Sequence, residues 1–382
     1  MQHVFMRWPA QVLFGRGVLA EFPAHLPRLG VRRALIVTDP GIRRAGLLER
    51  VAGAMRASGA HCELFDKVHP DPPLEDVLAG AEIARQCGVD AIVGLGGGSA
   101  MDAAKAIAVL TPEGRCIEEL FGHDRVPTPG LTKILIPTTG GSGSEISDSC
   151  NFSDHRAGDV KRILLGRHLL ADLSVVDPAL TDHAPPSVTA ESGIDALTHG
   201  LEAFLCRNAS TFSDIWAREA MRLAARSLPE AVERGAAAPQ ARDDMALAAM
   251  LGNAAADMAG LGAVHGLTHG LTARYPISHG RSNAILLPVV TRFNAAAQPA
   301  RYAEIAGIFS AFAPRPGSDA ADALQNFCAA IGLAGRLRDF GIGAAELPQR
   351  ALSAVGDFPR HFGANPRPVS PEDAAGLYSA AW

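Results

Sequence analysis

The sequence predicts two parts of different fold class: an α/β domain with a parallel sheet over residues 1–184 and an all-helical domain over 185–382. In the first part, short apolar and β-branched runs alternate with helical stretches, whereas the second part is rich in alanine and reads as helices with short breaks. A chain of 382 residues is also too long for one ordinary hydrophobic core. We place the boundary at 182–186, where Pro185 and Pro186 interrupt the chain.

The strands of the first part are recognised as short runs of apolar and β-branched residues that are stopped by glycine, proline or aspartate. We expect helical stretches from the second strand to about residue 58, over 74–87 and over 100–110. Strands that alternate with helices form a parallel sheet with right-handed crossovers. The expected strands are 12–15, 34–38, 61–68, 91–95 and 133–136.

Composition argues against several classes of function. The net charge is −5 and no long run of Lys or Arg occurs, so nucleic acid is not an expected partner. The six cysteines form no CxxC pair, which argues against a disulfide framework or a thiolate metal site and suits a cytoplasmic location. No apolar stretch of about 18 residues occurs, and residues 1–17 lack a long apolar core, so we expect neither a membrane span nor a signal peptide.

Two glycine-rich loops follow neighbouring strands. Gly-Gly-Gly-Ser at 96–99 follows a buried strand and opens a helix, where glycines let the backbone approach a pyrophosphate and the helix N-terminus offers free N–H groups. Ser99 can cap this helix or donate a hydrogen bond to the phosphate. A polar loop at 137–145 follows the next strand. Both loops leave the carboxyl ends of parallel strands, where open α/β sheets bind ligands, so together they predict a dinucleotide site.

The first of these loops differs from the usual dinucleotide fingerprint. Its glycines follow the third clear strand and not the first, so it is not a standard Rossmann GxGxxG loop. The alternatives are a tight strand-to-helix turn for residues 96–99 and a surface loop for residues 137–145.

Asp39, just after the strand at 34–38, is a candidate for selecting the cofactor. A carboxylate at this position can accept hydrogen bonds from both adenosine ribose hydroxyls and would repel a 2′-phosphate, which favours NAD over NADP. The alternative is an ordinary turn aspartate before Pro40 and Gly41.

Histidines and one carboxylate at helical spacing predict a metal site. Residues four apart on a helix share one face. A capping box of Ser192 with Asp195 is the alternative for the carboxylate, but it does not explain His199. Three imidazoles and one carboxylate suit Fe(II) or Zn(II), and the ligand set does not choose between them. The candidates are Asp195, His199, His265, His269 and His279, of which one His is spare.

In combination, these motifs resemble the iron-containing (group III) alcohol dehydrogenase family, over nearly the whole chain. That resemblance implies a dehydroquinate synthase-like architecture, with an α/β dinucleotide-binding domain followed by an all-α domain. It implies an oxidoreductase that transfers a hydride between a small alcohol or aldehyde and NAD, with NADP possible, in a homodimer or larger homo-oligomer. The matching stretches are 96–105, 137–145, 193–199 with Glu202, 265–269, His279-Gly280, 176–178 and 365–367.

The resemblance also implies roles for individual residues. Asp195, His199, His265 and His279 would bind Fe(II) or Zn(II), and His269 would lie by the nicotinamide and the substrate and relay a proton. The chain departs from the family pattern at Gly140, often Ala, at Ser142, often Thr, and at Asp71, often Asn. The cofactor site would be lined by Gly97, Gly98, Ser99, Asp102, Thr138, Thr139, Ser142, Lys161 and Leu180.

Other functions remain open at this point. A maleylacetate reductase reduces a carbon–carbon double bond and can lack the metal set, so the four intact candidate ligands argue against it. A hydroxyacid–oxoacid transhydrogenase would hold its nicotinamide tightly. A dehydroquinate synthase-like lyase would need more basic residues for a phosphate substrate. From another class, a non-catalytic protein could use the same motifs to bind a nucleotide or a metal.

Overall fold

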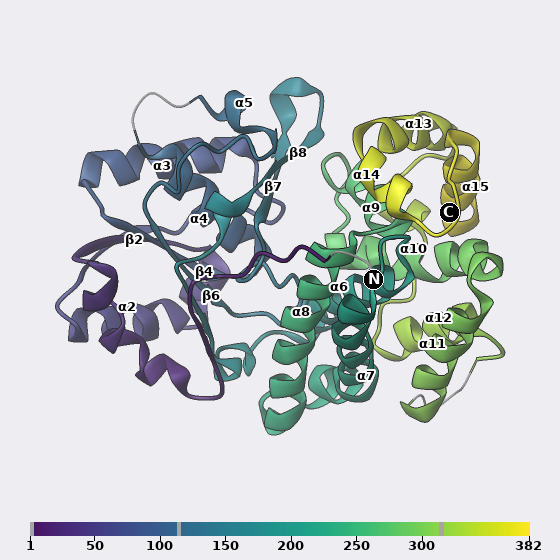
Figure 1. Ribbon diagram of the computed structural model, residues 1–382, viewed down its shortest axis with the longest axis horizontal. Helices are drawn as coiled ribbons and strands as arrows, with labels where there is room; N and C mark the ends of the chain where they lie inside the picture. Colours follow the sequence, from purple (N-terminus) through teal and green to yellow (C-terminus); the bar gives the residue numbers. More distant parts are fainter. Residues whose placement is uncertain (1–3, 113–115, 313–316) are drawn as a thin grey trace. The chain divides into compact units, whose positions relative to one another are not determined.

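The computed structural model describes residues 4–112, 116–312 and 317–382, and the chain forms two compact units. The α/β unit comprises residues 7–139 and 143–184 (Figure 1). The helical unit comprises residues 185–382, together with 140–142 and the residues before Arg7. The predicted fold class is confirmed, since the first unit contains a parallel sheet and the described residues after 185 form helices and no strand. The division into domains 1–184 and 185–382 stays a prediction.

A six-stranded sheet, in which every neighbouring pair is parallel, forms the centre of the α/β unit, in the order β1-β9-β6-β4-β2-β3. All six residues of β4 are buried, as expected for a strand with both faces covered. The five predicted strands are all present, although the one predicted over 61–68 ends at Phe65, before the proline-rich segment. The strands are β1 (Val12–Phe14), β2 (Arg33–Val37), β3 (His61–Phe65), β4 (Ala91–Gly96), β6 (Thr132–Pro137) and β9 (Leu173–Val176).

A second sheet was not predicted. It has three strands in the order β5-β8-β7, and β7 pairs with β8 in the antiparallel sense. Polar residues occupy most of the β7 sequence, Ser-Cys-Asn-Phe-Ser-Asp, so its pattern does not read as a strand. β9 was also not predicted. The strands of the second sheet are β5 (Gly122–His123), β7 (Ser149–Asp154) and β8 (Val160–Leu165).

Helices cover both faces of the six-stranded sheet. Along β2, Leu35 belongs to a hydrophobic core built with α3 and α4, and Ile36 belongs to a separate core built with α2. Because successive strand residues point to opposite faces, the two cores lie on the two sides of the sheet. The helix predicted over residues 74–87 is confirmed, because α3 has the same bounds in the structure. The helices are α1 (Pro40–Arg44), α2 (Leu47–Ala57), α3 (Leu74–Cys87), α4 (Gly98–Leu110) and α5 (Ile117–Leu120).

The helical unit is built around the close packing of α6, α7 and α8. Small residues permit the approach, because a Cβ on Gly193 would stand 2.2 Å from the Leu228 side chain and one on Gly252 would stand 2.7 Å from the Ala196 carbonyl oxygen. The abundance of Ala and Gly in this half therefore has a packing reason. The helices are α6 (Pro186–Leu205), α7 (Thr211–Arg234), α8 (Pro239–Ala259), α9 (Ala263–Thr272), α10 (His279–Asn294), α11 (Pro299–Phe312), α12 (Ala320–Ala330), α13 (Leu347–Asp357), α14 (Pro359–Ala364) and α15 (Pro371–Ala381).

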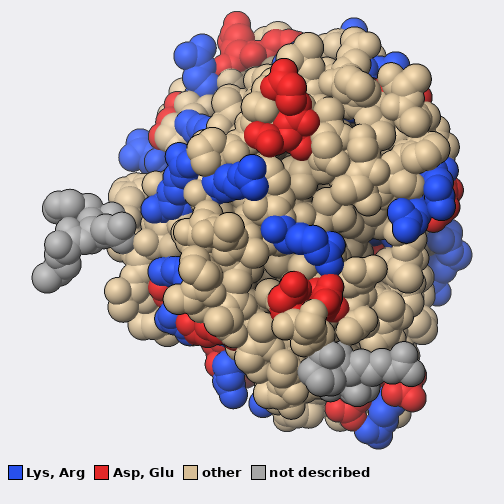
Figure 2. Space-filling model, turned by 90° about the vertical axis from the view of Figure 1, so that its right-hand side faces the viewer, with Lys and Arg blue, Asp and Glu red and all other residues tan. Residues whose placement is uncertain are grey.

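In the part of the chain that the structure describes, no single helix has both the length and the apolar composition needed to cross a membrane. Only α8 and α9 taken together, with a bend of 104° between them, meet these two criteria. Figure 2 shows one face of the molecule, on which basic and acidic side chains lie among wide uncharged areas and neither sign dominates.

Candidate active site

Helix α6 carries three of the polar side chains at the centre of the helical unit. Asp195, His199 and Glu202 are all buried. The spacing of four residues brings the Nδ1 atom of His199 to 3.8 Å from the Oδ1 atom of Asp195. Because α6 begins at Pro186, Asp195 lies well inside the helix, and the alternative of a capping box with Ser192 is wrong.

Helices α9 and α10 contribute the other histidines. His265 and His269 lie on α9, and His279 is the first residue of α10, after the N-cap Ser278. The start of α10 fits tightly against α6, since a Cβ on Gly280 would stand 2.0 Å from the carbonyl oxygen of Glu191. Only glycine permits this approach, which sets the position of His279 beside α6.

The structure brings the four predicted metal ligands together. The Oδ1 atom of Asp195 lies 3.3 Å from Nε2 of His279 and 3.5 Å from Nε2 of His265. One ligand atom from each of these three residues lies within 4.8 Å of the other two, a spacing that could hold a metal ion. The ring of His199 lies beside them, with its centroid 4.7 Å from that of His265.

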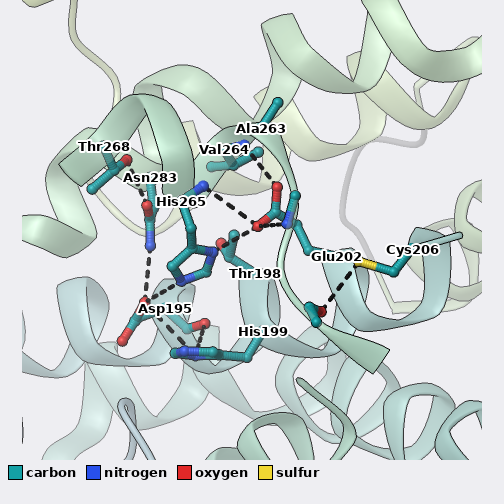
Figure 3. A network of polar contacts seen from close by, with 12 residues as sticks. Asp195, Thr198, His199, Glu202, Cys206, Ala263, Val264, His265, Thr268 and Asn283 are labelled. Carbon is teal, nitrogen blue, oxygen red and sulfur yellow. Dashed lines mark hydrogen bonds and ion pairs between the residues drawn. The ribbon is translucent and has the colours of Figure 1, made fainter. Parts of the chain in front are cut away.

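Hydrogen bonds orient three of the four candidate ligands, His265, His199 and Asp195 (Figure 3). The Nδ1 atom of His265 lies 2.7 Å from Glu202, and that carboxylate also accepts the backbone N–H groups of Gly262 and Val264 at 2.9 and 2.7 Å. The Nδ1 atom of His199 lies 2.9 Å from the backbone carbonyl oxygen of Asp195. With both Nδ1 atoms donating, we assign the Nε2 lone pairs of His199 and His265 as the free ligand atoms.

The aspartate is fixed as well. The side-chain amide of Asn283 donates to Oδ1 of Asp195 at 2.9 Å, and the hydroxyl of Thr268 donates to the amide oxygen of Asn283 at 2.7 Å. Thr268 and Asn283 are themselves buried, so this chain of hydrogen bonds holds the carboxylate in one orientation. Glu202 was named at first only as part of a matching motif, and Asn283 was not identified at all, because neither contact shows in the local sequence.

The charges of the buried side chains at this site favour a bound cation. Burial raises the pKa of Asp195, but the neighbouring histidines outweigh this and hold the pKa well below its usual range. Burial lowers the pKa of His265, but the carboxylates of Asp195 and Glu202 outweigh it and raise that pKa to about 9. Burial lowers the pKa of His199 to about 4, which keeps this imidazole neutral. At neutral pH the two buried carboxylates therefore face a protonated His265 and a neutral His199, and a divalent ion would take the place of the proton on His265.

One atom supports the fit to a metal directly. Among the described residues, Nε2 of His265 is buried and has no hydrogen-bond partner. Buried polar atoms without partners are rare in native proteins, and a missing ion is one of the few explanations for them. The donor set of three imidazoles and one carboxylate matches Fe(II) or Zn(II), so the residues present fit the group.

His269, the fifth histidine, lies next to the metal-ligand candidates. Its ring centroid is 5.2 Å from that of His279, and it also contacts Phe358 at 5.1 Å and His361 at 5.4 Å. His361, on α14, was not predicted from the sequence. The close packing of α14 against α9 places it there, because a Cβ on Gly266 would stand 3.2 Å from Cβ of His361.

Replacing Gly280 by Ala should disrupt the position of His279. The added Cβ would overlap the backbone of Glu191, so α10 must shift away from α6. We expect Gly280→Ala to lower the free energy of unfolding by about 1–3 kcal/mol and to reduce the bound metal. Gly307→Ala on α11 is the matched control, because a Cβ there meets nothing within 4 Å. Thermal melts and metal analysis test this, and unchanged metal content in Gly280→Ala would contradict it.

In the α/β unit, three loops that were predicted to bind the cofactor follow three adjacent parallel strands. Asp39 follows β2, Gly97 and Gly98 follow β4, and Thr138 follows β6. The loops therefore meet at one edge of the sheet, at the carboxyl ends of its strands. The hydroxyl of Thr138 is buried and has no hydrogen-bond partner among the described residues.

Gly97 lies close to Thr139, and hydrogen bonds engage one carboxylate oxygen of Asp39. A Cβ on Gly97 would stand 3.3 Å from the Thr139 hydroxyl, so a larger residue would narrow the space between these loops. The Oδ1 atom of Asp39 caps α1 by accepting the N–H groups of Gly41 and Ile42. Its Oδ2 atom points toward Gly96, 3.4 Å from the position of a Cβ there. Asp39 thus serves as a turn residue with one oxygen and can contact a ribose with the other.

Ser99 and Lys161 contact Asp71, one of the three residues that differ from the family pattern. Gly97 is the N-cap of α4, so Ser99 does not cap the helix, and its hydroxyl accepts the backbone N–H of Asp71 at 3.1 Å. Asp71 has a positive φ of 55° and forms an ion pair with the buried Lys161 on β8. Burial lowers the pKa of Lys161 to about 7, while the negative charge of Asp71 beside it favours the protonated ammonium.

The other predicted cofactor residues, which are Asp102, Leu180 and Ser142, all contact protein groups in the structure. Asp102, on α4, has both carboxylate oxygens engaged in hydrogen bonds with Ser144 and the Asn151 backbone. The side chain of Leu180 is buried in the hydrophobic core of the α/β unit. Ser142 belongs to the helical unit, where its carbonyl oxygen accepts the side-chain amide of Asn253 at 2.7 Å.

Gly140 and Gly141 belong to the same short segment of the helical unit. A Cβ on Gly140 would stand 3.0 Å from the Met245 backbone, and one on Gly141 would stand 2.7 Å from Ser192. Gly140 stands where the family often has Ala, and in this chain the position lies in tight contact with α8.

Comparison with known proteins decides the family. The model of iron-containing alcohol dehydrogenases matches residues 9–178, and the C-terminal model of the same family matches residues 189–382. The chain belongs to the iron-containing alcohol dehydrogenase family. The resemblance seen in the sequence is confirmed, and the chain is an oxidoreductase that acts on alcohol donors.

Individual members of the iron-containing alcohol dehydrogenase family are similar over the whole length. Long-chain-alcohol dehydrogenase 1 of Geobacillus thermodenitrificans is 37% identical over 96% of this chain and 94% of its own. The NAD-dependent methanol dehydrogenase of Bacillus methanolicus is 32% identical over 98% of each chain. The crystal structure of a 1,3-propanediol oxidoreductase superposes with a TM-score of 0.93 at 31% identity, covering 100% of both chains.

Proposed function

We propose that the protein is an iron-dependent, NAD-linked alcohol dehydrogenase that interconverts small alcohols and aldehydes. The observation that carries this proposal is the cluster of Asp195 with His199, His265 and His279, in which the buried Nε2 atom of His265 makes no hydrogen bond. These four residues would hold the ion. Family membership favours iron, although the donor set also suits Zn(II).

NAD is the proposed cofactor, with NADP as the alternative. One relative is an NAD-dependent methanol dehydrogenase. In this chain, Oδ2 of Asp39 is uncommitted and negative, so it would accept ribose hydroxyls and repel a 2′-phosphate. Gly97, Gly98, Ser99, Thr138 and Thr139 would line the phosphates, because they end two neighbouring parallel strands.

The mechanism depends on what the chain's own residues position. When bound, the ion supplies Lewis-acid polarisation of the substrate oxygen, and the nicotinamide supplies hydride chemistry. Glu202 and Asn283 hold His265 and Asp195 in fixed orientations, so the ligand atoms need little rearrangement. The imidazole of His269, whose ring contacts Phe358 and His361, would relay the proton that leaves the alcohol hydroxyl, directly or through a ribose hydroxyl or water, and would return it in aldehyde reduction.

A panel assay tests the proposal. Small alcohols and aldehydes are offered with NAD(H) and with NADP(H), and turnover is followed at the nicotinamide absorbance. We expect turnover of at least one alcohol–aldehyde pair with NAD(H). Oxidation of NADH by maleylacetate, without alcohol turnover, would assign the chain to the reductase branch. Nucleotide that stays bound through gel filtration would favour a transhydrogenase, and an absence of any turnover would favour a non-catalytic binding protein.

Replacing Asp39 by Asn should relax the choice of cofactor. The amide oxygen of Asn can still cap α1, but the negative charge that repels a 2′-phosphate is gone. We expect the ratio of kcat/KM for NADH to that for NADPH to fall about tenfold, which corresponds to about 1.4 kcal/mol. Steady-state kinetics with both cofactors measures this ratio, and a ratio equal to that of the wild type would refute a role of Asp39 in selection.

Two further features stay predictions. The six cysteines are free, which suits the predicted cytoplasmic location. A homodimer or larger homo-oligomer is the predicted assembly.

A further inference from the structure

A lysine with no exposed surface lies next to the glycine-rich loop at 96–99. The side chain of Lys105, on α4, is completely buried. Its ammonium group donates to the hydroxyls of Ser144 and Ser147 at 2.9 Å each and to the carbonyl oxygen of Ser149 at 2.8 Å. An ammonium group has three N–H donors, so these contacts use all of them.

Asp102, one helical turn before Lys105, completes the network. Its Oδ1 atom accepts the hydroxyl of Ser144 at 2.5 Å and its Oδ2 atom accepts the backbone N–H of Asn151 at 2.9 Å. The same Oδ1 atom lies 3.7 Å from the ammonium of Lys105, so the two charges offset each other. Ser144 donates to the aspartate and accepts from the lysine, which requires one arrangement of both side chains.

These hydrogen bonds connect the helix that follows the loop at 96–99 with the loop at 137–145 and the segment after it. Asp102 and Lys105 lie on the helix that the 96–99 loop opens. Their partner Ser144 lies at the end of the loop at 137–145, and the other partners lie at 147–151, which leads into β7. All of these residues belong to the α/β unit. A buried polar network in which the donors and acceptors are satisfied makes the structure around it more rigid.

We propose that Lys105 and Asp102 are positioning residues, which hold the segment after the second loop in the conformation that binds the nucleotide. Their charged atoms contact protein groups, so they act through Ser144, Ser147 and Asn151. Preorganised loops bind more tightly because less conformational entropy is lost on binding. This inference rests on the proposed NAD-linked function.

Lys133 supplies a matched control for the test. It is also a buried lysine of the α/β unit, but its ammonium donates to the carbonyl oxygens of Pro129 and Leu131 at the start of β6, at the end of the strand away from Thr138. Lys105→Met and Lys133→Met therefore remove the same buried charge, one beside the cofactor loop and one away from it. NADH affinity by fluorescence titration, bound iron per chain and melting temperature are measured for both.

We expect Lys105→Met to raise the Kd for NADH about tenfold or more, the usual effect of removing groups that orient a binding residue. Lys133→Met should keep the wild-type Kd at a comparable loss of melting temperature, and both should keep the bound iron. An unchanged Kd in Lys105→Met, or an equal rise in Lys133→Met, would overturn the inference. If the wild type itself binds no NADH, it is the proposed function that fails.

Ser147→Ala tests the same positioning role if Lys105→Met does not fold. It removes one acceptor of the Lys105 ammonium and leaves the ion pair with Asp102 in place. We expect a smaller rise in the Kd for NADH, of about threefold, with the iron content unchanged. A Kd equal to that of the wild type in a folded Ser147→Ala protein would also contradict the positioning role.

Discussion

Replacing His265 by Ala should abolish metal binding and activity while leaving NAD binding largely intact. His265 lies between the carboxylates of Asp195 and Glu202, and its buried Nε2 atom, 3.5 Å from Oδ1 of Asp195, makes no hydrogen bond. Loss of the ion removes several kcal/mol of transition-state stabilisation, so kcat/KM should fall about 10³-fold or more. Metal analysis, steady-state kinetics and NADH titration measure the three effects.

Two comparisons make the His265→Ala result specific. His61→Ala removes an exposed histidine at the start of β3, in the α/β unit, and should keep full activity and full metal content. The NADH Kd of His265→Ala should stay within about twofold of the wild type, because the nucleotide loops that we propose end strands of the α/β unit. Full activity of His265→Ala after treatment with a chelator would show that the metal assignment is wrong.

Replacing Glu202 by Gln should weaken the metal site without removing a ligand. Glu202 accepts hydrogen bonds from Nδ1 of His265 and from the N–H groups of Gly262 and Val264. A Gln side chain offers one oxygen and turns a donor toward these donors, so His265 loses its fixed orientation. We expect metal affinity to fall about 10–100-fold and the free energy of unfolding to drop by about 1–3 kcal/mol.

A surface carboxylate provides the control for Glu202. Glu304 forms an exposed ion pair with Arg218, and such pairs contribute about 0–1 kcal/mol, so Glu304→Gln should leave metal affinity unchanged. Competition with a chromogenic chelator gives the metal affinities, and thermal melts give the stabilities. A Glu202→Gln protein that binds the metal as tightly as the wild type would refute the orienting role.

The sequence was sufficient where function depends on local spacing. Asp195 and His199 are four residues apart, and a helix brings them onto one face, as the structure has them. The six-stranded sheet follows from apolar runs such as residues 91–95, which are buried on both faces. The two glycine-rich loops follow from the same strands, because parallel strands end at one edge of a sheet.

Contacts between distant segments could not be derived in this way. Glu202 reaches the start of α9, about sixty residues later in the chain, and nothing in its local pattern shows that a carboxylate is needed there. His361 comes beside His269 because α14 packs closely on Gly266. The partners of Lys105 are serines about forty residues later in the chain, and the local pattern of its helix does not show that its ammonium is buried among them.

Asp39 is a residue for which the sequence allowed two interpretations. The sequence allowed a turn aspartate or a ribose-binding carboxylate; the structure confirms the turn role, in which Oδ1 caps α1, and contact of Oδ2 with a ribose stays a prediction. Local sequence patterns indicate which residue types a site needs. Which atom of a residue makes which contact depends on how the chain packs.

The most direct test of the central claim is the metal content of the protein purified without chelator, measured together with NAD-dependent alcohol turnover before and after the metal is removed and restored. We expect about one Fe or Zn per chain, consistent with one cluster of four ligands. Activity should be lost with the metal and should return when Fe(II) or Zn(II) is added. Full activity in a protein that holds no metal would contradict the account and leave the cluster around Asp195 needing another explanation.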